Sequence, residues 1–134
     1  MISVKLRSIP ETEAALGWAG GHSVVIDRPE GTAGGQGIGF NGGEMLALAI
    51  GGCFCNDLRY VAHDMGMALV AISVNVSIAI DGSPPMVTGA TMQVGIETED
   101  SGADVAELLR RAKQSSTISN SVQHGFPVLL VEGI

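Results

Sequence analysis

Basic and aromatic residues are scarce in this chain of 134 residues. Seven lysines and arginines stand against fourteen aspartates and glutamates, which gives a formal net charge of −7, and aromatic residues make up 4% of the chain. Nucleic-acid binding needs clustered cations to contact the phosphates and aromatic rings to stack on the bases. The composition therefore argues against a nucleic-acid partner.

The sequence also has no recognisable targeting segment and no long apolar run. A charged segment followed by an apolar one, as in a secretory signal, is missing from the N-terminus. The most apolar run extends from Met45 to Phe54, and polar side chains follow from Asn56, which predicts a run too short to span a bilayer. We therefore expect a cytoplasmic protein with reduced thiols and no membrane partner. The length predicts a single domain over residues 1–134.

Cysteine and histidine are also few, with two and three residues respectively. Cys53 and Cys55 are two positions apart, so on a helix they point to nearly opposite faces and cannot pair with each other. The three histidines, His22, His63 and His124, are far apart, and no His or Cys pair has ligand spacing on a common face. The sequence therefore predicts no metal site.

Glycine, in contrast, is abundant, and it concentrates between Arg28 and Gly43. Glycines of this kind can hold a phosphate, but no Lys-Ser or Lys-Thr pair follows them. Their order does not fit a dinucleotide-binding fingerprint either. We interpret the stretch as a flexible loop that leads to a helix, and we expect no cofactor.

Residue periodicity predicts an α+β fold. Strands are expected over 2–7, 14–18 and 22–27, with Gly20-Gly21 as a hairpin turn. Strict alternation predicts a longer antiparallel hairpin over 70–80 and 86–96, and a last strand is expected over 126–131. Helices are expected over the central stretch 41–66, ending at Gly66, over 103–113, and from Ser116 to His124. Ser101 followed by Asp104 resembles a capping arrangement for the second of these helices.

The stretch 41–66 contains both the most apolar helical run and the two cysteines of the chain. Its apolar residues lie on every face of the helix, which predicts burial all round. The order of several motifs in and around it resembles the OsmC/Ohr family of osmotically induced and organic-hydroperoxide-resistance proteins. The matching residues are Asp27, Pro29, Gly34-Gly35, Glu44-Met45-Leu46, Gly51-Gly52-Cys53 and, in the family's second motif, Ser119-Asn120.

This resemblance implies antiparallel sheets wrapped around a long central helix in an intertwined homodimer. It also implies thiol peroxidase chemistry, in which a thiolate attacks an organic hydroperoxide, becomes a sulfenic acid and is resolved by a second cysteine. Cys53 matches the family's first cysteine, but Ser116 occupies the place of the second. The resemblance thus indicates an atypical peroxide reductase that needs an external thiol.

The same resemblance makes Cys53 and Glu44 the catalytic candidates. Glu44 is the carboxylate nearest to the family's glutamate at the helix start, where this chain has Gly42-Gly43. The arginine of the hydroperoxide-resistance branch has no clear counterpart, because neither Arg7 nor Arg28 matches its position well.

Four alternatives stay open. Asp57, one turn after Cys53, disfavours a thiolate there, whereas Cys55 has Arg59 one turn on. For either cysteine the alternative is a small buried apolar residue. Ser116 fits a helix N-cap better than a catalytic hydroxyl. The alternative for the whole chain is a structural dimer, or one that binds a small apolar ligand without turnover.

Overall fold

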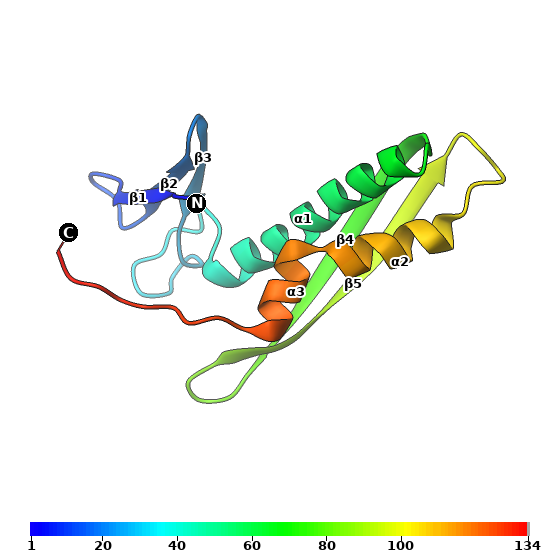
Figure 1. Cartoon of the computed structure of the whole chain (residues 1–134). Coiled ribbons are helices and arrows are strands. Elements are labelled where there is room, and N and C mark those ends of the chain that lie inside the picture. Colours follow the sequence, from blue (N-terminus) through cyan, green and yellow to red (C-terminus); the bar gives the residue numbers. More distant parts are fainter. Residues whose placement is uncertain (134) are drawn as a thin grey trace. The chain divides into compact units, whose positions relative to one another are not determined.

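Three short strands near the N-terminus form an antiparallel sheet in the order β1-β2-β3 in the computed structural model, which describes residues 1–133 (Figure 1). The strands are β1 (Lys5–Ser8), β2 (Ala15–Ala19) and β3 (His22–Ile26). Gly20-Gly21 joins β2 to β3, and Gly20 has a φ of 57°, a conformation that favours glycine. The predicted strands and hairpin turn are confirmed, with ends shifted by a few residues.

The chain contains two compact units, Met1–Leu46 and the part from Ala47 onward. The second unit is built on the long antiparallel hairpin of β4 (Leu69–Asp81) and β5 (Met86–Thr98). The helices α2 (Val105–Ser115) and α3 (Thr117–His124) follow the hairpin. The predicted hairpin and both helices are confirmed, whereas the single domain stays a prediction.

One face of the β4-β5 hairpin carries the core of the second unit. Alternate strand residues such as Val74 and Val94 are partly buried against it, and the residues between them are exposed. Phe54 and Leu58 of α1 (Gly42–Asp64) and Leu108 of α2 fill this core. Burial of each such side chain contributes about 1.5–3 kcal/mol, so this face of α1 holds the unit together.

Among the described residues of the second unit, nothing covers the opposite face of α1. Gly51 faces β4 so closely that a Cβ there would lie 2.8 Å from Cγ2 of Val76, which excludes a larger residue. At Gly52, one position on, a Cβ would meet nothing within 4 Å, and Leu48 is 53% exposed. Within this unit the hairpin covers a single side of α1, so burial on every face, which the family resemblance relates to a second chain, stays a prediction.

The helix α1 is longer than the apolar run in its sequence. With 23 residues it is long and apolar enough to cross a membrane by length and composition alone. Those two properties are weak evidence, because the core helices of soluble proteins share them. The packing of α1 against the β4-β5 hairpin indicates such a core helix.

Local hydrogen bonds determine where the helices begin and end. Asp104 is the N-cap of α2, where its Oδ1 accepts from the N–H of Glu107 at 3.0 Å, so the cap is Asp104 and not Ser101. At the end of α1, Gly66 has a φ of 65° and Met67 donates its N–H to the carbonyl of Ala62 at 2.8 Å. The predicted end at Gly66 is confirmed.

Residues 126–131 form no strand, so this prediction is wrong for the single chain. The segment is exposed, with Val128 at 87% and Leu130 at 101% exposure. A strand needs a neighbour to satisfy its backbone groups, and within residues 1–133 no strand pairs with this segment.

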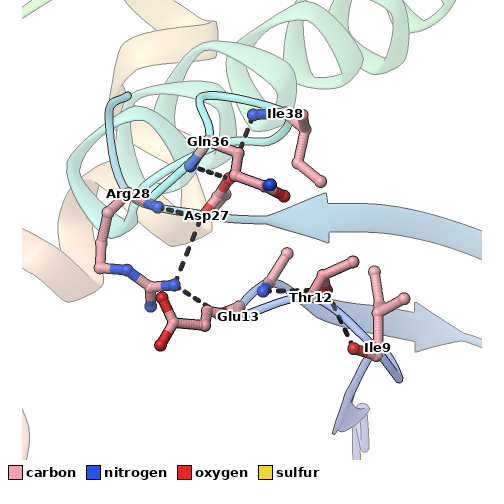
Figure 2. A network of polar contacts seen from close by, with 8 residues as sticks. Ile9, Thr12, Glu13, Asp27, Arg28, Gln36 and Ile38 are labelled. Atoms are coloured by element: carbon pink, nitrogen blue, oxygen red, sulfur yellow. Dashed lines mark hydrogen bonds and ion pairs between the residues drawn. The ribbon is translucent and has the colours of Figure 1, made fainter. Parts of the chain in front are cut away.

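The glycine-rich loop folds around the buried carboxylate of Asp27 (Figure 2). Its Oδ1 accepts from the N–H of Arg28 at 2.8 Å, and its Oδ2 accepts from those of Gln36 at 3.0 Å and Ile38 at 3.2 Å. The Arg28 guanidinium lies 3.3 Å from the carboxylate and also donates to the carbonyl of Glu13. The loop itself was predicted, but its backbone is tied to Asp27 where the sequence indicated a flexible connection.

These contacts also change the acidity of Asp27. Burial alone raises its pKa, but the hydrogen bonds from the N–H groups of Ile38, Gln36 and Arg28, together with the Arg28 charge, lower the pKa below its ordinary value of 3.8. The folded loop therefore favours the charged carboxylate.

Candidate functional site

Three side chains meet inside the second unit. Cys53 and Asp57 lie one turn apart on α1, so their side chains share a face, and the thiol donates to Oδ2 of Asp57 at 3.6 Å. Ser116 stands between α2 and α3, and its hydroxyl donates to Sγ of Cys53 at 4.0 Å. The predicted proximity of Asp57 to Cys53 is confirmed.

The two partners of Cys53 are deeply buried. Asp57 is 8% exposed and Ser116 is fully buried, and they are the buried polar residues that the structure describes in this unit. No cation forms an ion pair with Asp57 among residues 1–133. Burial of a polar group costs free energy of desolvation, which a hydrogen bond or a function must offset. The structure therefore places two buried polar groups beside the Cys53 sulfur, which a cysteine that only fills space does not need.

Ser116 occupies the predicted N-cap position of α3 but does not act as its cap. Its backbone is extended, with φ −67° and ψ 107°, and its side chain makes no capping hydrogen bond. The hydroxyl points to Cys53, which is 63 residues earlier in the sequence. The short turn between α2 and α3 thus brings the hydroxyl to the thiol, so the predicted position is right and the predicted capping bond is wrong.

Cys55 lacks the partner that the sequence indicated. Both cysteines are free thiols and partly buried. The Arg59 guanidinium, one turn after Cys55, donates to the carbonyl of Leu69 at 3.2 Å. This cation is therefore bound to the backbone at the start of β4. Of the two thiols, Cys53 is the one with side-chain hydrogen bonds among the described residues.

Glu44 begins α1 in a reciprocal capping arrangement with Asn41. Its Oε1 accepts from the N–H of Asn41 at 3.0 Å, and its own N–H donates to Oδ1 of Asn41 at 2.9 Å. The side chain is exposed. These contacts account for Glu44 in structural terms, and its catalytic role stays a prediction.

A mostly apolar groove of about 900 Å³ lies in the same unit. Ile50 and Phe54 of α1, Val94 of β5 and Leu109 of α2 contribute to its walls. The Ser119 hydroxyl also borders it and is buried, with no hydrogen-bond partner among residues 1–133. The groove could hold a small apolar molecule with one polar atom. Within residues 1–133 no group of three or more His, Cys, Asp or Glu side chains is placed to hold a metal ion.

Residues 34–130 match the family model described as OsmC-like protein. No curated protein sequence matches the chain. Among solved structures, an OsmC-like protein of Mycoplasma pneumoniae is similar at 14% identity and a TM-score of 0.77, covering 92% of this chain and 87% of the other.

Two further structures are named for organic hydroperoxide resistance. The Legionella pneumophila protein has 17% identity and a TM-score of 0.68, covering 92% of this chain and 89% of its own. The Bacillus subtilis protein has 23% identity and a TM-score of 0.58, covering 90% and 88%. At these identities the likeness shows a common α+β fold.

Proposed function

Because the chain belongs to the OsmC-like protein family, we propose that it is an atypical cysteine-dependent peroxide reductase that works with a single cysteine, Cys53. The observation that carries this proposal is the convergence of Asp57 and Ser116 on the Cys53 sulfur. The hydroperoxide-resistance proteins with a similar fold support an organic hydroperoxide as its substrate.

The proposed reaction has two stages. The Cys53 thiolate attacks the terminal oxygen of the hydroperoxide, and the O–O bond breaks to give a sulfenic acid and an alkoxide. The alkoxide takes up the proton that the thiol released and leaves as the alcohol. Ser116 carries no sulfur that could then form a disulfide. An external thiol therefore attacks the sulfenic acid with loss of water, and a second thiol releases Cys53 and leaves as the disulfide of the reductant.

Attack on the peroxide needs a thiolate, and the nearby carboxylate of Asp57 opposes one. Glu44 has the weaker part in this proposal: its Oε1 caps α1, and its Oε2, with no hydrogen bond in the described chain, is assigned to contact the substrate.

The working unit that we propose is a cytoplasmic homodimer without nucleic-acid or membrane partners. Support comes from the uncovered face of α1 and from residues 126–131, whose exposed apolar side chains have no cover in one chain. Sedimentation of the purified protein is expected to give twice the 13.7 kDa mass of the chain. A monomer at micromolar concentration would contradict the dimer.

Peroxide consumption tests the enzyme directly. With tert-butyl hydroperoxide and dithiothreitol, Cys53→Ser is expected to lower the rate at least ~100-fold, because the reacting sulfur is gone. Cys55→Ser is the matched control and is expected to keep the wild-type rate. Equal rates for the Cys53→Ser variant and the wild type would exclude Cys53 as the nucleophile.

The alternative function is a dimer that binds a small apolar ligand without turnover, and the groove beside Ile50 and Phe54 favours it. The same assay separates the two functions. A wild-type protein that consumes no peroxide, yet binds an apolar fluorescent probe that Phe54→Ala releases, would favour the binding protein.

A further inference from the structure

The hydrogen bonds around Cys53 suit a neutral side chain. A thiol has one proton to donate, and here it donates to Oδ2 of Asp57. Its sulfur is also a weak acceptor, and here it accepts from the Ser116 hydroxyl. The three groups thus form a hydrogen-bonded chain from Ser116 through Cys53 to Asp57, in which each donor has an acceptor.

The same arrangement opposes a negative charge on Cys53. Asp57 lies 3.6 Å from the sulfur, is 8% exposed and has no cation beside it among residues 1–133. Two negative charges at such a distance repel each other, and the burial of Asp57 strengthens the repulsion. The Ser116 hydroxyl offsets this repulsion only in part, since it is neutral.

We propose that Asp57 makes the sulfenic acid the end point of Cys53 oxidation and protects the thiol from irreversible loss. This inference rests on the proposed function. The sulfenic acid is neutral, and its O–H can replace the S–H as the donor to Asp57. The neutral oxidised product therefore keeps the hydrogen bond that the reduced thiol makes.

The next oxidation step meets the carboxylate unfavourably. A second hydroperoxide molecule would transfer one oxygen to the sulfenic acid, giving a sulfinic acid and a second alcohol. The reacting sulfenate and the ionised sulfinate are both anions at the place where Asp57 already carries a negative charge. Asp57 thus slows the oxidation of the sulfenic acid to the sulfinic acid. A cysteine without a resolving partner is especially open to this step.

Intact-mass spectrometry of single-cysteine protein tests this inference. In a Cys55→Ser background, we would treat the full chain with excess cumene hydroperoxide and follow the addition of the first oxygen, about 16 Da, and of the second, about 32 Da in total. Asp57→Asn keeps the shape of the side chain and removes its charge. This variant is expected to add the second oxygen about tenfold faster or more. Ser116→Ala is the matched control and is expected to change that rate far less, since it removes no charge.

The outcomes separate the inference from the function on which it rests. Equal rates of second oxidation with and without Asp57 would overturn the protective role and leave the peroxidase intact. A wild-type protein that never gains the first oxygen would overturn both. If Asp57→Asn fails to fold by circular dichroism, the wild type decides alone: dimedone is expected to trap its sulfenic acid after prolonged exposure to peroxide. Immediate passage to the second oxygen would refute the inference.

Discussion

Replacing Ser116 by cysteine is expected to redirect the oxidation of Cys53 from a sulfenic acid to an intrachain disulfide. The Ser116 hydroxyl is already 4.0 Å from the Cys53 sulfur and is fully buried, so the introduced thiol would face the sulfenic acid directly. Its attack releases water and needs the two sulfurs to approach to about 2.05 Å, a shift that side-chain rotation in the turn before α3 can supply.

The result is measured as the mass after one equivalent of hydroperoxide. The wild type is expected to gain about 16 Da, whereas most of the Ser116→Cys protein is expected to lose about 2 Da. Ser115→Cys is the matched control, because Ser115 is exposed and its hydroxyl bonds to the carbonyl of Arg111. A stable gain of one oxygen in the Ser116→Cys variant would mean that the two side chains do not meet in solution.

Asp27→Asn is expected to lower the melting temperature at pH 7 by on the order of 5–10 °C. The carboxylate accepts from three backbone N–H groups, and an amide would present its own donors to some of them. The glycine-rich loop would lose the contacts that tie it to the end of β3. Glu30→Gln removes one charge from an exposed position of the same loop and is expected to change the melting temperature little.

The drop in melting temperature caused by Asp27→Asn should become smaller at low pH. Because the folded loop lowers the pKa of Asp27 below 3.8, its contribution to stability is complete above that value and disappears as the pH falls through the lower folded pKa. The difference in melting temperature between the wild type and Asp27→Asn is therefore expected to be full at pH 7 and to shrink below about pH 4. An equal difference at pH 3 and pH 7 would show that the charge of Asp27 is not what stabilises the loop.

Local patterns predicted the parts of the fold that depend on local interactions. Alternation of apolar and polar residues located the β4-β5 hairpin, since period-two patterning follows from strand geometry. The end of α1 at Gly66 followed from the left-handed conformation that glycine adopts most easily. The strand expected over residues 126–131 failed for a different reason, because its formation depends on a neighbouring edge that the sequence pattern does not describe.

The candidate site divides in the same way. The contact between Cys53 and Asp57 could be predicted, because residues four apart on a helix face the same side. The hydrogen bond from Ser116 to Cys53 could not be predicted from residue spacing, since it crosses 63 positions and depends on how the turn before α3 packs on α1. The family resemblance related Ser116 to a second cysteine, whereas local rules assigned it to a helix cap. Glu44 shows the opposite case, because its contacts with Asn41 are local and indicate a structural role.

The exposed segment over residues 126–131 has a consequence for the life of the chain in a cell. In the proposed dimer, its apolar side chains are covered only after two chains have met, so completion of folding becomes a second-order process that slows as the protein is diluted. Until then, Val128 and Leu130 are open to proteases and chaperones that bind extended apolar chain. The amount of folded protein would therefore increase more than in proportion to the rate of synthesis.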